Sequence, residues 1–420
     1  MSIRNTRRRI VAMVGLGAGI LAASNVVCAQ IPCSYDVQII ASPLDCGLGT
    51  VNTYGLGLNE HGAVVGYYRC PLWDHTEAFL WTADGGFLTL QRPQGVSSAI
   101  AVDINDAGII CGTLWFSGLG YRGFVYDNGE WTILPPVVDL PGAWSGASAI
   151  NNDQIVVGER SITEDINPQN AYTWSVEKGF TDLGVMTGPS SFGSSISETG
   201  IVVGWTGNQT GSIANAFIWQ AGDLTLLGSV PRGFTSQAAA VTNDAIVVGH
   251  GRIPLKGAPV GAGRAFVWEG GKFEMLGTLP DHTRSAASGI TTEDQQVVGT
   301  SGNVDDNPNI VHGFIWRDGI MTNLNDLVSG DLEIVIRSAA AIVETGEIIA
   351  NGHDPEPNAV AFLLIPLADP LGDLNGDCQI GVIDLLILLG SWGDRESPAD
   401  LNDDGTVDYL DLRILLDNWG

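Results

Sequence analysis

Short apolar runs alternate with turns rich in glycine and asparagine along most of the chain, and one of these runs recurs at a fixed spacing. Its form is Ile-Asn-x-x-Gly-x-Val-Val-Gly, seen first, with substitutions, at residues 58–66 and again at residues 104–112. The last residues of its seven copies are separated by 46, 46, 46, 45, 50 and 51 positions. A period of this size predicts a protein built from repeated structural units.

A second run, Ala-Phe-x-Trp, interleaves with the first. Its seven copies lie at residues 78–81, 123–126, 171–174, 216–219, 265–268, 313–316 and 361–364. Each period predicts four strands: the Ala-Phe-x-Trp strand, a strand ending near Leu-Gly, the strand that runs into Ile-Asn, and the Val-Val-Gly strand. Because Asn and Gly accept positive φ, Asn-x-x-Gly favours a tight hairpin turn. Four strands in about 45 residues make a β-propeller blade, with the recurring tryptophans expected in the blade core.

The two ends of the repeat region predict how the ring closes. Residues 35–40 have the pattern of the second strand of a repeat, and residues 361–365 have the pattern of a first strand. If these two segments pair, they complete one blade and remove exposed sheet edges. The predicted fold class is therefore all-β, a seven-bladed β-propeller of about 46-residue repeats over residues 30–367, followed by a small α-helical module.

The interleaved signatures resemble the HAF repeat family of bacterial exported proteins, which is named for its His-Ala-Phe motif. His312-Gly313-Phe314 comes near that motif, although the first position is usually not His in this chain. The resemblance covers about residues 35–367. It implies an extracellular repeat domain and carries no established reaction.

Composition excludes nucleic acid as the expected partner. The chain has 420 residues, 19 Lys+Arg against 47 Asp+Glu, and a formal net charge of -28. Binding to a phosphate backbone needs clustered basic side chains, and the only lysines are Lys178, Lys256 and Lys272. Hydrophobic residues make up 45% of the chain, which is enough for a core.

The N-terminus has the pattern of an export signal. Arg4 and Arg7-Arg8-Arg9 precede an apolar run over residues 10–21, and small residues follow up to Ala29. This run is too short to span a bilayer, so residues 1–29 are predicted to be a signal peptide for the general secretory or the twin-arginine route. The mature protein is expected to be extracellular, at the cell surface or periplasmic, with no transmembrane segment.

Five cysteines remain after the predicted cleavage: Cys33, Cys46, Cys70, Cys111 and Cys378. Disulfides are expected in an oxidising compartment. Pairing of Cys33 with Cys46 is one arrangement, and the sequence alone does not fix the pairing.

The longer connections of the predicted blades gather on one face of the ring, where binding sites on a rigid scaffold usually lie. Candidate ligand-binding residues there are Tyr67, Trp73, Trp115, Tyr121 and Trp205. Exposed aromatic rings stack on sugar faces, so a polysaccharide or cell-wall ligand is one hypothesis, and rings that only cap the blade ends are the alternative. No catalytic motif is found, and no catalytic residue is nominated.

Composition changes after Pro366, where residues 368–372 form a predicted linker to a module at residues 373–420. Two acidic segments, residues 373–384 and 400–411, repeat at a spacing of 27 and each runs into an apolar helix, predicted over residues 385–389 and 410–416. A 12-residue loop holds calcium through oxygen atoms at positions 1, 3, 5, 7, 9 and 12. The predicted ligands are Asp373, Asn375, Asp377, Gln379 and Asp384 in the first loop, and Asp400, Asn402, Asp404, Thr406, Asp408 and Asp411 in the second. Cys378 replaces the turn glycine, so the first site is expected to be the weaker.

The duplicated loop and helix resemble a type I dockerin, over residues 373–420. Dockerins attach exported proteins to cohesin domains in polysaccharide-degrading assemblies, so the resemblance implies calcium as the bound metal and a cohesin-like protein as partner. Dockerins often carry Ser or Thr at loop positions 10 and 11, where this chain has Val382-Ile383 and Tyr409-Leu410. The docking surface is therefore expected to be apolar.

Taken together, the patterns favour an exported, non-enzymatic binding or scaffold protein, with a ligand on the propeller and calcium-dependent docking through the C-terminal module. The alternative is a polysaccharide-active hydrolase or lyase on the propeller, which acids converging near the propeller axis would favour. A third hypothesis is structural adhesion through the acidic surface and calcium.

Overall fold

The computed structural model describes residues 31–43, 51–137, 143–161, 169–185, 187–208, 213–255, 258–303, 311–330, 332–355, 358–395 and 397–419. The predicted signal peptide over residues 1–29 and the cysteine at position 46 lie outside these residues.

Most of the described chain consists of strands in four-stranded antiparallel sheets. The first six sheets are β2 (Asn52–Leu58), β3 (Val64–Arg69), β4 (Glu77–Thr82), β5 (Gly86–Thr89); β6 (Val96–Ile104), β7 (Ile110–Phe116), β8 (Gly120–Asp127), β9 (Glu130–Leu134); β10 (Ser145–Ile150), β11 (Val156–Ser161), β12 (Gln169–Ser175), β13 (Gly179–Gly184); β14 (Ser190–Ile196), β15 (Val202–Gly207), β16 (Ala214–Gln220), β17 (Asp223–Gly228); β18 (Gln237–Val241), β19 (Val247–Leu255), β20 (Ala258–Glu269), β21 (Lys272–Gly277); and β22 (Arg284–Ile290), β23 (Val297–Gly302), β24 (Val311–Arg317), β25 (Ile320–Asn323). The seventh is β26 (Val335–Ile342), β27 (Ile348–His353), β28 (Ala359–Pro366) and β1 (Tyr35–Ile40), and the 3-10 helix η1 (Leu324–Asp326) follows β25.

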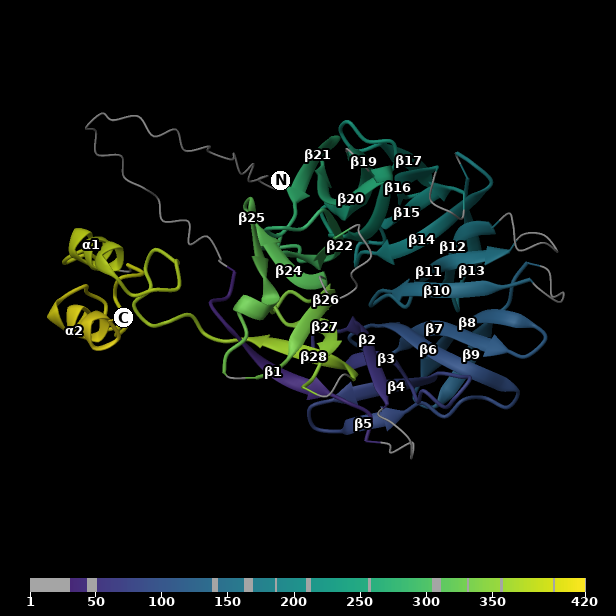
Figure 1. Cartoon of the computed structure of the whole chain (residues 1–420), viewed down its shortest axis with the longest axis horizontal. Coiled ribbons are helices and arrows are strands. Elements are labelled where there is room, and N and C mark those ends of the chain that lie inside the picture. Colours follow the sequence, from purple (N-terminus) through teal and green to yellow (C-terminus); the bar gives the residue numbers. More distant parts are fainter. Residues whose placement is uncertain are drawn as a thin grey trace. The chain divides into compact units, whose positions relative to one another are not determined.

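The strand that runs into the Asn-x-x-Gly turn is the innermost strand of each sheet. Each innermost strand contacts the innermost strands of the neighbouring sheets, and β26 contacts β2. The seven sheets therefore form a closed ring around a common centre (Figure 1). This arrangement confirms the predicted seven-bladed β-propeller.

The last blade is closed by the two ends of the repeat region. Strand β1 pairs antiparallel with β28, with Tyr35 opposite Pro366 and Ile40 opposite Ala361. The outermost strand of this blade thus comes from the start of the described chain and the other three come from its last repeat. The predicted closure is confirmed.

The final glycine of the Val-Val-Gly run lies opposite a β-bulge in the innermost strand. A Cβ on Gly66 would lie 1.9 Å from the carbonyl oxygen of Tyr54, and a Cβ on Gly204 would lie 1.9 Å from that of Phe192. Only glycine allows two backbones to approach this closely. The bulge therefore explains why glycine recurs in the repeat.

The second signature supplies the core of each blade mainly through its Phe position, although Trp316 at the Trp position is also buried in a core cluster. The residues at that position are fully buried: Phe79, Phe124, Tyr172, Phe217, Phe266, Phe314 and Phe362. Trp81 and Trp174 are only partly buried and pack against the edges of the core clusters. The expectation that the tryptophans lie in the core therefore holds less strongly than the same expectation for the phenylalanines.

The signature asparagine joins neighbouring blades. Asn105 Oδ1 accepts a hydrogen bond from the N–H of Ile109 in its own turn (2.9 Å), and its Nδ2 donates to the carbonyl of Asn151 in the next blade (3.1 Å). Asn59 and Asn151 make the same two bonds. Because Asn105 is buried, the N–H of Ile109 would otherwise be an unsatisfied polar group, whereas the carbonyl of Asn151 also accepts the N–H of Gln154.

The C-terminal module contains α1 (Val382–Gly390) and α2 (Tyr409–Asp417). The two helices contact each other and share a small core that includes Ile380, Leu388, Val407 and Leu415. Helix α1 begins three residues earlier than predicted, because Asp384 accepts the N–H of Gly381 and caps the first turn. Within the described ranges, no helix is long and apolar enough to cross a membrane.

Candidate functional site

A cavity of about 600 Å³ lies on the axis of the propeller and is lined by the innermost strands of all seven blades. Its mouth is formed by the second residue of each Asn-x-x-Gly turn. We call this set the turn collar, and its members are Glu60, Asp106, Asn152, Glu198, Asn243, Thr292 and Glu344. Four of the seven are acidic, so carboxylates do converge near the axis.

The collar side chains accept hydrogen bonds across blade boundaries. The N–H of Glu60 donates to Asp106 Oδ1 (3.0 Å), and the N–H of Asp106 donates to Asn152 Oδ1 (2.9 Å). The N–H of Asn152 donates to Glu198 Oε2 (2.9 Å), and the N–H of Glu344 donates to Glu60 Oε1 (3.0 Å), which bridges the last blade and the first. These carboxylates therefore serve as acceptors that hold the ring together.

Burial changes the acidity of several carboxyl groups around the cavity. Burial raises the pKa of Glu60 and of Glu198, against the lowering effect of their backbone hydrogen bonds. Asp103 in β6 is more strongly affected, because burial raises its pKa to about 6 although it accepts the N–H groups of Ile104 and Ile150. Asp103 thus links β6 to β10 of the next blade and is a carboxyl group that titrates near neutral pH.

Glu159 in β11 does not line the cavity but contacts a residue that does. Ser148, which lines the cavity, places its Oγ 3.4 Å from Glu159 Oε2. Burial raises the pKa of Glu159 to about 7. Asp103 and Glu159 both contact β10, so two carboxyl groups with raised pKa values flank one strand of the cavity wall.

On the propeller surface, two pairs of aromatic rings come from the first two blades. Trp73 stacks on His75 with ring centroids 5.1 Å apart. Trp115 in β7 packs against Tyr121 in β8 with centroids 4.4 Å apart, and these two side chains are 36% and 49% exposed. Trp115 and Tyr121 are predicted on one of the longer connections, and the structure instead places them on the two strands of a β-hairpin.

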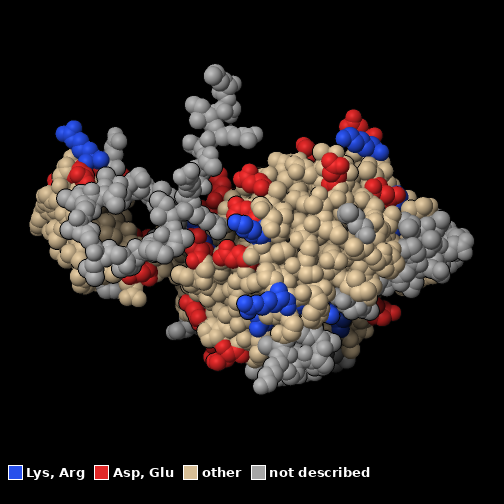
Figure 2. All heavy atoms as spheres, turned by 90° about the horizontal axis from the view of Figure 1, so that it is seen from above, with Lys and Arg blue, Asp and Glu red and all other residues tan. Residues whose placement is uncertain are grey.

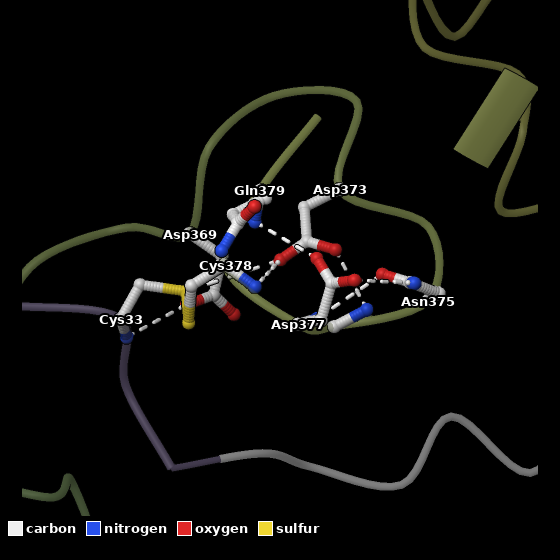
Figure 3. The surroundings of a disulfide bond; sticks show 8 residues. Cys33, Asp369, Asp373, Asn375, Asp377, Cys378 and Gln379 are labelled. Carbon is white, nitrogen blue, oxygen red and sulfur yellow. Dashed lines mark hydrogen bonds between the residues drawn. A yellow bond between two sulfur atoms is a disulfide. The ribbon is translucent and has the colours of Figure 1, made fainter. Parts of the chain in front are cut away.

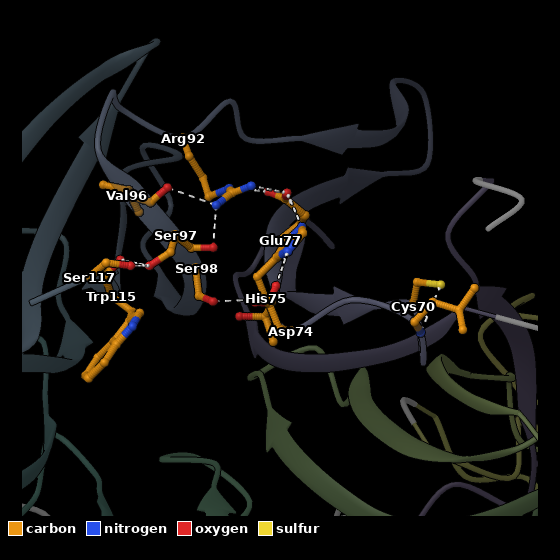
Figure 4. Close-up of polar contacts among 12 residues, drawn as sticks. Cys70, Asp74, His75, Glu77, Arg92, Val96, Ser97, Ser98, Trp115 and Ser117 are labelled. Atoms are coloured by element: carbon orange, nitrogen blue, oxygen red, sulfur yellow. Dashed lines mark hydrogen bonds and ion pairs between the residues drawn. The ribbon is translucent and has the colours of Figure 1, made fainter.

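Polar contacts connect these two pairs of rings (Figure 4). Glu77 accepts bonds from Nε and Nη2 of Arg92 (2.8 and 2.7 Å), and Nε2 of His75 lies 3.4 Å from Glu77 Oε1. Arg92 donates to the carbonyl of Ser97, and the hydroxyl of Ser97 donates to the carbonyl of Trp115 (3.0 Å). The segment before β4 is therefore fixed relative to the β7–β8 hairpin.

Two other predicted ligand-binding aromatics lie on strands and not on loops. Tyr67 belongs to β3 and stacks on Tyr54 at 5.0 Å, and Trp205 belongs to β15 and stacks on Phe192 at 3.8 Å. Both strands extend past the point where the apolar pattern ends, because they stay paired with the innermost strand. These rings pack against their own blades, so their predicted placement on loops is wrong.

The first acidic loop of the C-terminal module folds around the carboxylates at its two ends. Asp373 Oδ2 accepts the N–H of Cys378 (2.8 Å). Asp384 is buried and accepts the N–H groups of Asn375 (3.0 Å) and Gly381 (2.8 Å). Burial acts to raise the pKa of Asp384, but the backbone hydrogen bonds outweigh it and lower this pKa below its ordinary value.

The second loop repeats this arrangement. Asp400 Oδ2 accepts the N–H of Gly405 (2.8 Å), and buried Asp411 accepts the N–H groups of Asn402 (3.2 Å) and Asp408 (2.7 Å). Each loop thus holds the carboxylates of its first and last positions in place through its own backbone N–H groups.

The oxygen atoms of the first loop are gathered closely. Carboxylate oxygens of Asp373, Asp377 and Asp384 all lie within 4.8 Å of one another, and in the described part of the chain the second loop holds no carboxylate group of three at this spacing. Calcium takes hard oxygen ligands, so the donor set suits this ion. The sequence predicts a weaker first site, yet the first loop is the more closely gathered of the two.

Cys33 forms a disulfide with Cys378, so its predicted pairing with Cys46 is wrong (Figure 3). The reason is the closure of the ring. Strands β1 and β28 are paired, and beyond them the N–H of Leu367 donates to the carbonyl of Ser34 (2.9 Å). The start of the described chain therefore runs beside the segment that leads into the first acidic loop.

The remaining cysteines differ from each other in state. Cys70 is also disulfide-bonded, whereas Cys111 is buried and free. Burial raises the pKa of the Cys111 thiol well above its ordinary value, so this thiol is unreactive at neutral pH.

The helices of the module present large apolar side chains to solvent. The exposed ones are Val382, Ile383, Leu386, Ile387, Leu389, Tyr409, Leu410 and Leu416, together with Trp392 and Trp419 just after the helices. Val382 and Tyr409, at loop position 10 of the two repeats, are 64% and 66% exposed. By contrast, Figure 2 shows acidic side chains as separate groups on a largely uncharged face of the molecule.

No protein-family model matches this chain, and no curated protein does. Among solved structures, acylaminoacyl peptidase from Pyrococcus horikoshii matches with 13% identity over 74% of this chain and 51% of that chain, at a TM-score of 0.44. Oligogalacturonate lyase from Vibrio parahaemolyticus matches with 9% identity over 79% of this chain and 97% of that chain, at 0.46. A gluconolactonase from Xanthomonas campestris matches with 11% identity over 80% and 97%, at 0.35. This chain thus spans about half of the peptidase, and at such values the likeness carries no argument about activity.

Sequence reasoning missed the turn collar and the two buried carboxyl groups. The signal for the collar was present, because the second residue of the turn is acidic in four repeats, at Glu60, Asp106, Glu198 and Glu344. Nothing comparable marks Asp103 or Glu159, since the other blades carry no acidic residue at either position.

Proposed function

We propose that this protein is an exported binding or scaffold protein, in which the C-terminal module docks onto a partner protein and the propeller presents a ligand-binding surface. The observation that carries the proposal is the exposed apolar surface of α1 and α2. Exposed apolar patches of this extent mark interaction sites on soluble proteins. The resemblances to HAF-repeat proteins and to dockerins support the same reading.

Calcium is the proposed metal of the module. Asp373, Asn375, Asp377, the Gln379 carbonyl and Asp384 would hold it in the first loop, and Asp400, Asn402, Asp404, the Thr406 carbonyl, Asp408 and Asp411 in the second. A bound cation neutralises the acidic loops and fixes the start of each helix, so the apolar surface keeps one shape. Docking is therefore expected to depend on calcium.

The partner proposed for the module is a cohesin-like domain with an apolar face. Position 10 of each loop is apolar and exposed at Val382 and Tyr409, so a polar partner surface would leave these side chains without matching contacts. The test is biosensor binding of the mature chain to a panel of immobilised cohesin domains, with calcium and with chelator. Binding that needs calcium and is lost in Tyr409→Asp supports the proposal. Binding to no cohesin would leave the docking role without a cohesin-like partner.

For the propeller, the proposed ligand is a polysaccharide or cell-wall polymer at Trp73, Trp115 and Tyr121. Trp115 and Tyr121 are exposed, and Trp73 is partly buried against the core of its blade. Flat exposed rings bury the apolar faces of sugars. The test is retention of the protein on insoluble polysaccharides and cell walls. Retention should fall in Trp115→Ala and remain in Phe234→Ala, which removes an exposed aromatic ring from another blade. Equal retention of the two variants would rule out this surface.

The second candidate function is a polysaccharide-active hydrolase or lyase. The observation that favours it is the gathering of carboxyl groups at the axial cavity, with Asp103 and Glu159 flanking β10. General acid–base chemistry needs groups that titrate near neutral pH. Against it, Asp103 and the collar acids already accept backbone N–H groups. Turnover of a polymer that disappears in Glu159→Gln, with folding retained, would favour the enzyme.

A further inference from the structure

The Cys33–Cys378 disulfide joins the closing blade of the propeller to the inside of the first acidic loop. Cys378 stands at loop position 6, where Gly405 stands in the second loop, and its φ is +66°. A residue with a side chain is strained at positive φ, so ordering the loop into this conformation costs free energy. At the same position of the second loop Gly405 takes φ +91° freely, and the positive-φ side chain of that loop is Asp403 (φ +56°), a residue type that accepts this conformation more readily.

The disulfide lies directly against a predicted metal ligand (Figure 3). Cys33 Sγ is 3.9 Å from Asp373 Oδ2, and the N–H of Cys378 donates to the same oxygen at 2.8 Å. On its other side, the N–H of Cys33 lies 3.4 Å from Asp369 Oδ1. The carboxylate of Asp373 is therefore positioned by a backbone group whose own place is fixed by the covalent link.

We propose that Cys33 and Cys378 are positioning residues of the first calcium site and that their disulfide sets its affinity. This inference rests on the proposed calcium-binding function. The link restrains the strained loop before calcium arrives, so less conformational freedom is lost on binding. The disulfide also links the loop to a residue 345 positions away in the sequence. The first site therefore depends on ring closure, and the second does not.

Breaking the link needs a dithiol reductant, such as a thiol–disulfide oxidoreductase of the exported compartment. The dithiol gives two electrons and two protons, the bond between the two sulfur atoms breaks, two thiols form, and the dithiol becomes a disulfide. After this step Cys378 keeps its positive φ without restraint. The first site then binds calcium more weakly, and the second site is unchanged.

The test is calorimetric calcium titration of the mature chain, with Asp400→Ala and Asp404→Ala together to silence the second loop. The affinity of the first loop should fall about tenfold on adding dithiothreitol and by the same factor in Cys33→Ser without reductant. Dithiothreitol should cause no further change in Cys33→Ser, which separates this disulfide from that of Cys70. Cys378→Gly should recover most of the affinity, because glycine accepts the positive φ.

A control chain with Asp373→Ala and an intact second loop should bind calcium equally with and without reductant. Equal first-loop affinity in the oxidised chain and in Cys33→Ser would overturn the inference alone. Absence of calcium binding at both loops of the oxidised chain would overturn calcium-dependent docking as well. If Cys33→Ser fails to fold, reduction of the folded native chain gives the same comparison.

Discussion

The turn collar and the acidic loops use the same kind of hydrogen bond for different purposes. In both, a carboxylate accepts backbone N–H groups. In the collar the acceptor and the donor belong to different blades, as with Glu60 and Asp106, 46 positions apart. In the loops they lie within 12 residues, as with Asp384 and Asn375. The collar spreads its charges around a ring and joins blades, whereas each loop turns its charges toward one point.

The largest effect is expected where the collar depends on a buried amide. Asn105→Ala leaves the N–H of Ile109 without a partner and removes one of the two hydrogen bonds to the carbonyl of Asn151, so the free energy of unfolding should fall by about 2–4 kcal/mol. Urea unfolding followed by tryptophan fluorescence measures this. Asn105→Ser should lose less, because Ser197 already fills the equivalent place with an N–H···Oγ bond to Ile201. A neutral Asn105→Ala variant would contradict the role of the asparagine.

In the acidic loops, replacing a carboxylate should lower calcium affinity and leave the stability of the propeller ring unchanged. Asp411→Asn should lower the calcium affinity of the second loop by about a hundredfold and remove roughly 2.7 kcal/mol of calcium-dependent stability from the module. The reason is that Asp411 is the carboxylate at position 12. Differential scanning calorimetry with calcium and with chelator should show that the propeller transition does not move.

Asp403→Asn is the matched control for this change. Asp403 is exposed, is not a predicted ligand, and has a positive φ that Asn accepts. Calcium affinity should therefore stay close to that of the native chain. A similar loss in both variants would mean that overall charge, rather than ligand position, governs binding.

The wall of the axial cavity and the acidic loops should also respond differently to pH. The pKa of Asp103 is raised from 3.8 to about 6, so between these pH values the folded protein binds more protons than the unfolded chain. Stability from this group is therefore present at low pH and is lost as pH rises through the window. The pKa of Asp384 is lowered, so its contribution is lost only as pH falls below about 3.8.

Asp103→Asn tests this difference, because it removes the titrating group. Its amide oxygen accepts only one of the two N–H groups, which adds a loss that does not vary with pH. Relative to the native chain, the free energy of unfolding of the variant should therefore rise by about 1–2 kcal/mol between pH 4 and pH 7. Urea unfolding across this range provides the measurement. A difference that stays constant with pH would show that the carboxyl group of Asp103 is not perturbed.

The sequence predicts most of the fold because the repeats encode it. The bulge favours glycine, the turn favours Asn, Ser or Thr with a side-chain oxygen that accepts an N–H, and both recur at a regular spacing. The Cys33–Cys378 link was beyond reach, because it depends on two segments brought together only when the ring closes. The placement of Tyr67 and Trp205 failed for a related reason, since strand pairing continues where the apolar pattern has stopped.

The smallest effect is expected from a substitution that removes a charge of the collar but keeps its hydrogen bond. Glu60→Gln keeps an oxygen that accepts the N–H of Glu344, so the free energy of unfolding should change by less than about 0.5 kcal/mol. Asn152 and Asn243 support this expectation, because their amide oxygens already accept N–H groups in the same place in other blades. The same exchange of carboxylate for amide in Asp384→Asn should remove calcium from the first loop. If Glu60→Gln instead destabilises the ring by several kcal/mol, the negative charge of the collar is required, and the contrast between a ring that needs acceptors and loops that need charge fails.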